Sequence, residues 1–205
     1  MRDQSDTRTR IQQVALELFT EQGYEATSLR EIAERLGVTK AALYYHFKTK
    51  EDIVGSLVQD RLDALDMLLD WASTQPPGPE LRREFVHRYA AELHEGRHQE
   101  IMRFFERNQT ALRDNPKSEQ MRERMFDIID ILSSPGDPLV VRLRGSMAIF
   151  ALHATWFVLR DPSVTDEQRQ EAALQVALDL IEPTDQSPAG SAGGSAGGSV
   201  GRAAR

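Results

Sequence analysis

The stretch of sequence that decides the fold is TSLREIAERLGVTKAALYYHFKTKEDI, residues 27–53. It opens with Ser-Leu-Arg-Glu from Ser28, an S-x-x-E capping box that predicts the start of a short helix. Gly37 follows, at a point where a tight turn favours a left-handed backbone that glycine adopts without a Cβ clash. Thr39 then caps a second short helix that runs to about His46. Two short helices joined by such a turn are typical of a helix-turn-helix.

The side chains of this stretch divide into an inner and an outer set. Ala33 is small at the position where the two helices cross closely. The inner set is apolar at helical spacing and comprises Ile32, Leu36, Val38 and Leu43. The set left for the outer face comprises Lys40, Ala41, Tyr44 and Tyr45.

Helical periodicity extends outward from this stretch in both directions, while strand signals are scarce. An apolar stripe precedes it, formed by Ile11, Val14, Ala15, Leu18 and Phe19. A long helix follows from near Lys50 to about Trp71 and is broken by QPPGP at 75–79. Further helices are predicted at 80–95, 98–113, 117–133, 138–160 and 166–182. The sequence therefore predicts an all-α fold of nine helices.

Composition narrows the possible chemistry of the 205 residues. There is no cysteine, which excludes a disulfide scaffold, a cysteine zinc site, an iron–sulfur centre and a thiol nucleophile. The first twenty residues lack a continuous apolar segment, and the most apolar stretch, at 147–159, is too short to span a bilayer. We therefore expect a cytoplasmic protein without a signal peptide or membrane contact.

Charge is distributed unevenly along the chain. The net charge is −7 overall, but residues 1–50 carry +1 and residues 51–205 carry −8. A nearly neutral N-terminal part can contact phosphates locally although the protein as a whole is acidic. The last 22 residues, 184–205, are mostly Gly, Ala and Ser, and we expect them to be disordered.

Residues 27–53 resemble the DNA-binding signature of the TetR family of transcriptional repressors. The matching pattern is Thr/Ser before the first helix, I-A, L-G-V, a capping hydroxyl and L-Y-x-H-F-x-x-K-E. The resemblance implies a three-helix helix-turn-helix DNA-binding domain at 7–52 and a helical ligand-binding and dimerisation domain at 53–183. The helix that begins near Lys50 links the two and extends to about residue 73.

The resemblance also implies the residues that contact DNA. The helix from Thr39 to His46 is expected to lie in a major groove and to present Lys40, Ala41 and Tyr45 to the base edges. The residues expected to hold phosphates are Thr27, Thr39, Tyr44, His46 and Lys50. The expected partner is a double-stranded, pseudo-palindromic operator.

The C-terminal part is expected to hold a small-molecule effector. Aromatic and polar residues recur there at helical spacing, and apolar cavities with a few polar groups are where small ligands bind in helical bundles. The candidate contacts are Phe85, Tyr89, Met102, Phe105, Asn108, Gln109, Met125, Phe126, His153 and Trp156. For each of these residues, a purely structural place in the core is the alternative.

Dimerisation is expected through the helices at 138–160 and 166–182. The first of these is apolar almost all round, so that it requires cover from a partner subunit. Gly145 and Ala148 are expected to permit close approach across a two-fold axis. The final helix is expected to add a stripe of Leu174, Ala177, Leu178 and Ile181 to a four-helix bundle.

Two enzyme motifs compete with this interpretation. His94-Glu95-Gly-Arg-His98 matches H-E-x-x-H, a zinc hydrolase pattern, but Gly96 interrupts the helix and no third ligand is evident. G-x-S-x-G occurs at 193–197 and 197–201, in a Gly/Ser tract without the strand and helix that a nucleophile elbow requires. We therefore predict no catalytic residue, no metal and no cofactor. The predicted function is a homodimeric repressor released from its operator by a small molecule, and a zinc hydrolase is the alternative.

Overall fold

The computed structural model describes most of the chain, and all of its regular structure there is helical. The described residues are 2–95, 101, 104, 117–158, 161 and 163–182, with the backbone alone described at 2–5, 95, 118 and 155–158. The helices are α1 Arg2–Glu21, α2 Leu29–Leu36, α3 Lys40–His46, α4 Lys50–Ser73, α5 Pro79–Glu95, α8 Lys117–Leu132, α9 Leu139–Val158 and α10 Asp166–Ile181. The predicted all-α class is confirmed.

The helix count differs from the prediction. Nine helices are predicted, whereas the described part of the chain contains eight. The difference is the predicted helix at 98–113, of which only Ile101 and Phe104 are among the described residues. The expected disorder of 184–205 also concerns residues outside the description.

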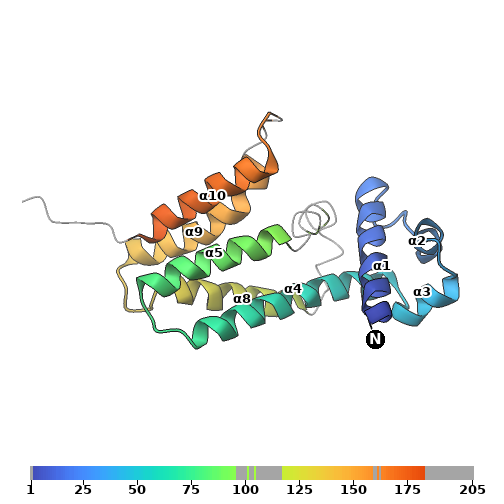
Figure 1. The fold of residues 1–205 in the computed structure, drawn as a ribbon, viewed down its shortest axis with the longest axis horizontal. Coiled ribbons are helices and arrows are strands. Elements are labelled where there is room, and N and C mark those ends of the chain that lie inside the picture. Colours follow the sequence, from blue (N-terminus) through green and yellow to red (C-terminus); the bar gives the residue numbers. More distant parts are fainter. Residues whose placement is uncertain are drawn as a thin grey trace, which may run out of the picture.

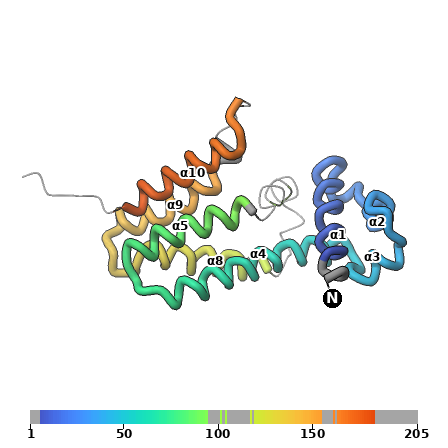
Figure 2. The backbone as a smooth tube through the Cα atoms, viewed as in Figure 1, coloured from blue at the N-terminus to red at the C-terminus, as the bar shows by residue number. Residues whose placement is uncertain are grey.

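The helices form a small head and a larger body joined by α4 (Figure 1). Helices α1, α2 and α3 lie together at one end of the molecule, and α5, α8, α9 and α10 lie at the other. Figure 2 traces α4 as the helix that leaves the head and enters the body, where α8 packs along it. Among the described helices, none is long and apolar enough to cross a membrane.

The head has its own apolar core. Its buried residues come from α1, the helix-turn-helix and the start of α4: Ile11, Ala15, Leu16, Leu18, Phe19, Tyr24, Ile32, Ala33, Leu43, Phe47, Ile53, Val54 and Leu57. Phe104 joins them from a distant part of the sequence, with its ring centre 5.3 Å from that of Phe19 and 5.8 Å from that of Tyr24. Phe104 therefore connects the polypeptide that follows α5 to the head.

The body has a second core, in which α9 and α10 pack closely against each other and α5 packs against α10. Its largest fully buried side chains are Phe85, Tyr89, Leu65 and Ile128. Helix α4 contributes to both cores, through Ile53 to Leu57 in the head and through Leu65 to Ala72 in the body. The two cores are therefore joined by a single continuous helix.

A polar contact fixes the head on α4. Gln12 Nε2 donates to Ser56 Oγ at 2.8 Å and to Asp60 Oδ2 at 2.6 Å. Arg8 Nη1 lies 3.2 Å from Asp60 Oδ1. Because Gln12 and Ser56 are buried, these hydrogen bonds are costly to break and define one orientation of α1 on α4.

Candidate DNA interface and effector site

The turn between α2 and α3 is fixed at both ends by local hydrogen bonds. Ser28 Oγ accepts from the Glu31 amide at 3.2 Å, and Glu31 Oε2 accepts from the Ser28 amide at 2.7 Å. At the other end of α2, Gly37 has φ +74°, the left-handed conformation that the sequence predicts. The predicted capping box and turn are both confirmed.

Helix α3 is anchored so that one face remains outside. Thr39 Oγ1 accepts from the Ala42 amide at 3.1 Å, which caps the first turn. Leu43, fully buried, and Phe47, at 3% exposure, attach the helix to the head core. Lys40, Ala41 and Tyr45 are therefore left exposed on a helix of fixed orientation.

The outer face of α3 carries the side chains expected to read bases. Lys40 and Ala41 are exposed, and Tyr45 is 69% exposed, an unusual position for a large aromatic side chain. Tyr44 is half-buried, and Lys40 Nζ lies 5.4 Å from its ring centre. The ammonium group of Lys40 can donate to guanine, and the methyl group of Ala41 can contact a thymine methyl. A tyrosine hydroxyl can bind a phosphate.

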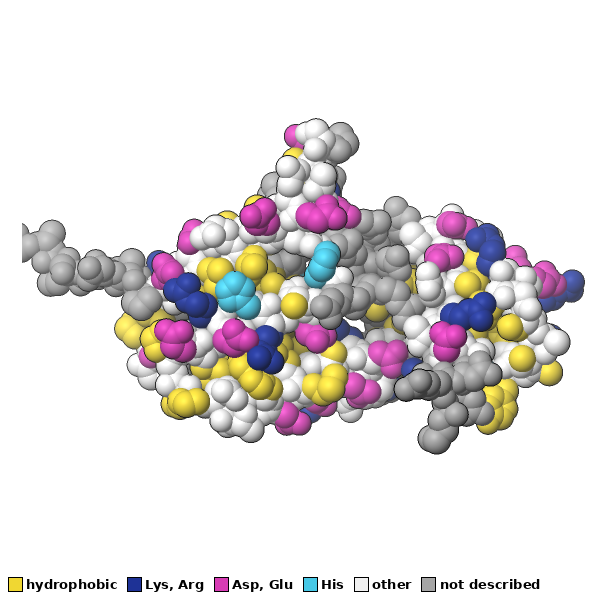
Figure 3. Space-filling view, in the orientation of Figure 1, with side chains coloured by type: hydrophobic (Ala, Val, Ile, Leu, Met, Phe, Trp, Pro, Cys, Tyr) yellow, Lys and Arg dark blue, Asp and Glu magenta, His cyan; other side chains and the backbone are white. Residues whose placement is uncertain are grey.

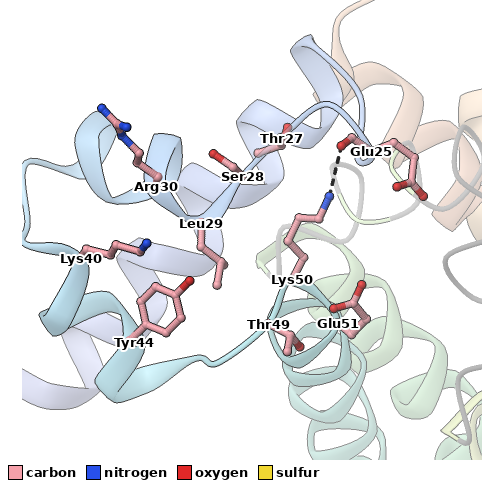
Figure 4. A pocket seen from close by; sticks show the side chains of 10 residues that line it. All are labelled: Glu25, Thr27, Ser28, Leu29, Arg30, Lys40, Tyr44, Thr49, Lys50 and Glu51. Carbon is pink, nitrogen blue, oxygen red and sulfur yellow. Dashed lines mark hydrogen bonds between the residues drawn. The ribbon is translucent and has the colours of Figure 1, made fainter.

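An open depression of about 500 Å³ lies beside this face and is lined by residues of α2, α3, α4 and the segment before α2 (Figure 4). Lys40 and Tyr44 reach it from α3, Arg30 from α2 and Lys50 from α4. The first turns of α2 and α4 border it at Ser28 and Thr49. Helix starts and nearby cations favour a phosphate group, although Glu25 and Glu51 also line the depression.

Two predicted phosphate contacts are already engaged within the protein. Thr27 is 2% exposed, and its hydroxyl donates to the Gly23 carbonyl at 2.8 Å. Lys50 Nζ donates to the Tyr24 carbonyl at 2.6 Å and lies 4.5 Å from the Tyr24 ring centre. Both side chains are thus engaged in part-buried hydrogen bonds to the backbone, and direct contacts of Thr27 and Lys50 with phosphate stay a prediction. His46 is half-buried, with its ring centre 5.3 Å from that of Tyr45.

Four of the predicted effector contacts, Phe85, Tyr89, Met125 and His153, meet inside the body. Phe85 and Tyr89 are fully buried, with ring centres 6.3 Å apart. Tyr89 Oη lies 2.8 Å from His153 Nε2 and 3.8 Å from Met125 Sδ. Helices α5, α8 and α9 thus bring three polar or polarisable groups to one point of an apolar core.

The other predicted effector contacts do not join this cluster in the described structure. Phe126 is 60% exposed, because it lies on the face of α8 opposite to Ile128, and its contact with an effector stays a prediction. Of Trp156 only the backbone is described. The remaining candidates lie outside the described residues: Met102, Phe105, Asn108 and Gln109.

Arg61 is a member of this cluster that the sequence analysis missed. Its guanidinium carbon lies 5.4 Å from the Tyr89 ring centre, and its Nη2 atom is buried. The signal is a charged residue on the apolar stripe of α4, four residues after Leu57 and four before Leu65. A stripe of that spacing faces the core, so an arginine on it is directed towards the core and not towards solvent.

Burial sets the protonation of the cluster. It lowers the pKa of His153 from 6.5 to about 4, and the nearby positive charge of Arg61 adds to the effect. Burial also raises the pKa of Tyr89 above its usual value, although Arg61 opposes that shift. At neutral pH the cluster therefore contains a neutral imidazole and a neutral phenol beside one cation.

Helix α9 leaves one apolar face uncovered. Its exposed large side chains are Leu139, Val140, Leu143, Met147 and Phe150, and Val176 of α10 is 49% exposed. On the face seen in Figure 3, apolar side chains gather over the body, whereas Lys and Arg on the head stand among acidic residues. A row of such large side chains marks a surface for association.

The small residues of this helix face inward, which corrects the prediction for them. A Cβ atom on Gly145 would lie 3.2 Å from Leu132 Cβ of α8, and Ala148 is fully buried. Both residues therefore permit close packing inside the subunit. The predicted stripe of α10 also packs on the subunit's own core: Leu174, Ala177, Leu178 and Ile181.

The zinc motif finds no support in the described structure. His94 is exposed in the last turn of α5, and His98 lies outside the described residues. No group of three His, Asp or Glu side chains that could hold a metal occurs among the residues described. The G-x-S-x-G repeats also lie outside them.

Comparison with known proteins agrees with the geometry of the head. Residues 11–57 match the family described as bacterial regulatory proteins, tetR family. The N-terminal part of this chain, residues 11–57, is thus similar to the TetR-family regulators. Over 100 residues it is 35% identical to the HTH-type transcriptional regulator AcrR of Shigella flexneri, a match covering 47% of this chain and 46% of that protein. The matched residues 11–57 include α2 and α3.

Two further proteins show how far the similarity extends. The chain is 37% identical over 71 residues to the HTH-type transcriptional repressor KstR2 of Mycolicibacterium smegmatis, which covers 33% of this chain and 35% of that protein. The chain thus matches less than half the length of these curated relatives. The crystal structure of the TetR-family regulator PfmR from Thermus thermophilus is similar over 84% of this chain and 96% of that chain, with TM-score 0.62 and 28% identity. The body of this chain therefore has a fold similar to that of PfmR, although the two sequences differ.

Proposed function

We propose that this protein is a homodimeric, sequence-specific DNA-binding transcriptional repressor that a small-molecule effector releases from its operator. The observation that carries the proposal is the outer face of α3, where Lys40, Ala41 and Tyr45 are exposed on a helix fixed by Thr39 and Leu43. The family match at 11–57 covers this helix. The relatives named above are transcriptional regulators, and one of them is named a repressor.

In the proposed complex, α3 enters the major groove and presents Lys40, Ala41 and Tyr45 to base edges. Tyr44, Thr39 and the helix starts beside the depression at Ser28 and Thr49 contact phosphates. Thr27 and Lys50 support these contacts indirectly, because their side chains donate hydrogen bonds to backbone carbonyls of the head. His46 contributes from its half-buried position next to Tyr45.

The proposed dimer forms through the uncovered face of α9 together with α10. Leu143 and Phe150 are 61% and 57% exposed, and they lie two turns apart on the same face. A two-fold axis along this face carries two heads, which suits an operator made of inverted half-sites. The head at 7–52 and the body at 53–183 then act as the DNA-binding and the dimerisation and effector domains, with α4 shared between their cores.

Effector release is proposed to act through α4. Its first half is packed in the head core and its second half in the body core. An effector that binds in the body favours one orientation of α4, and the two heads then no longer match the spacing of the half-sites. A coupling free energy of about 1–3 kcal/mol between the two sites is enough for a useful switch.

The proposal is tested by selecting duplexes from a random-sequence pool on the immobilised full-length protein. We expect enrichment of two inverted half-sites whose centres are separated by about one helical turn, or roughly 34–36 Å. A variant with Lys40→Ala and Tyr45→Ala is the control and should enrich no such pair. Failure of the wild-type protein to enrich any sequence would contradict the proposal.

A further inference from the structure

The guanidinium of Arg61, a half-buried residue, turns one nitrogen into the body without a matching anion among the described residues. Its Nη2 atom is inaccessible to solvent and has no hydrogen-bond partner within that part of the chain. Burying a charge without a partner is costly, and native proteins pair nearly all such groups. A buried guanidinium nitrogen without a hydrogen-bond partner therefore requires an explanation.

The acidic residues nearest to Arg61 in sequence on α4 are engaged with other side chains. Asp60 accepts from Gln12 and pairs with Arg8. Asp63 accepts from Gln59 Nε2 at 2.7 Å, and Asp66 pairs with Arg124. The residues one helical turn away on either side of Arg61 are apolar, so no carboxylate of α4 shares its face.

Within the described part of the other helices, the groups placed beside Arg61 are the neutral side chains of Tyr89 and His153. Tyr89 Oη and His153 Nε2 lie 2.8 Å apart, and Met125 Sδ is 3.8 Å from the same hydroxyl. The phenol of Tyr89, whose ring lies beside the guanidinium, can donate to an anion that Arg61 holds. The walls around them are apolar, with Phe85 and Leu65 fully buried.

We propose that the effector is an amphipathic anion, whose carboxylate or sulfonate pairs with Arg61 and Tyr89 while its apolar body lies among the side chains of α5, α8 and α9. This inference rests on the proposed effector-responsive function and names the chemistry of the effector. Arg61 lies midway along α4, between the residues that enter the head core and those that enter the body core. An anion bound there acts directly on the helix that carries the head.

The experiment compares two fluorescent probes of nearly the same shape. Anilinonaphthalene sulfonate carries the anion, and phenylnaphthylamine is the uncharged counterpart. Both are titrated onto the full-length wild-type protein and onto Arg61→Met, Arg61→Lys and the control Arg122→Met. Arg122 is an exposed arginine of α8 in an ion pair with Glu119, so its loss removes an equal charge outside the cluster.

We expect Arg61→Met to weaken the binding of the sulfonate roughly tenfold to a hundredfold and to leave the uncharged probe within about twofold, because a charge-assisted pair is lost. Arg61→Lys should retain part of the affinity, and Arg122→Met all of it. Equal effects on both probes, no effect on either, or no saturable sulfonate binding by the wild-type protein would overturn the proposal.

A second measurement separates an effector site from a structural role of Arg61. If the cation has no partner in the unliganded protein, Arg61→Met removes a buried charge and raises the melting temperature. A lower melting temperature would show that Arg61 is paired within the protein and would overturn the proposal. Operator selection by Arg61→Met should be unchanged, so loss of the anion site and failure of DNA binding are distinguishable.

Discussion

The hydroxyl of Tyr89 on α5 lies 2.8 Å from Nε2 of His153 on α9. This contact joins two helices of the body inside an apolar core, with the cation of Arg61 beside it. Because the phenol and the imidazole are both neutral at pH 7, protonation of His153 would place a second positive charge in the same buried site. The stability of the body is therefore linked to pH.

Acidification is expected to destabilise the protein through His153. Its pKa is about 4 in the folded protein and 6.5 when exposed, so only the unfolded chain takes up this proton between those values. The free energy of unfolding should fall as pH decreases from about 6.5 to about 4, by up to about 3 kcal/mol. Urea unfolding at fixed protein concentration measures the effect.

The variant His153→Gln should flatten this part of the pH profile, because it removes the titrating group and keeps a hydrogen-bonding side chain. The same substitution at His87, an exposed residue of α5, is the matched control. A profile of His153→Gln that still follows the wild type would show that His153 is not responsible.

Replacing a glycine of the head and a glycine of α4 by alanine should change the free energy of unfolding in opposite directions. Gly37 has φ +74° and Gly55 lies within α4, and an added Cβ meets nothing within 4 Å at either. Gly37→Ala should therefore cost about 1 kcal/mol through backbone strain alone. Gly55→Ala should gain about 0.5–1 kcal/mol by restricting the unfolded chain. Urea unfolding of both variants that shifts in the same direction would contradict this interpretation.

The uncovered face of α9 is expected to hold the dimer together. Replacing Leu143 and Phe150 by Glu places two charges on that face and should yield a monomer in light scattering. Affinity for an operator should then fall at least about tenfold, because the two half-sites are no longer bound together. Phe126→Glu is the matched control, since Phe126 is equally exposed but lies on α8. If that variant also dissociates, or the α9 variant remains a dimer, the interface lies elsewhere.

The sequence predicts well those features that depend on neighbours along the chain. The capping box at Ser28, the left-handed Gly37 and the cap at Thr39 each involve residues three or four positions apart. The inward direction of Ile32 and Leu43 follows from the same short spacing. Such features are decided by local geometry, which is why the head is recognisable from its sequence.

Features that depend on how helices pack against each other could not be predicted in this way. Helical spacing marks Gly145 as a point of close approach, but only the position of Leu132 on α8 shows that the approach is within the subunit. Phe104 belongs to the head core although it lies far from the head in sequence. Arg61 appears on an apolar stripe, yet its buried nitrogen is evident only once α5 and α9 are in place.

The central claim is that α3 reads a DNA sequence, and the most direct measurement is fluorescence anisotropy of the full-length protein on duplex DNA from the region around its own gene. We expect tight, sequence-selective binding that weakens steeply between about 50 and 200 mM salt. Lys40→Ala with Tyr45→Ala should lose at least about tenfold in affinity for that sequence. Arg122→Ala, which removes a charge on α8, should bind as the wild type does. Equal binding by the α3 variant, or wild-type binding without sequence preference at either salt concentration, would contradict the claim.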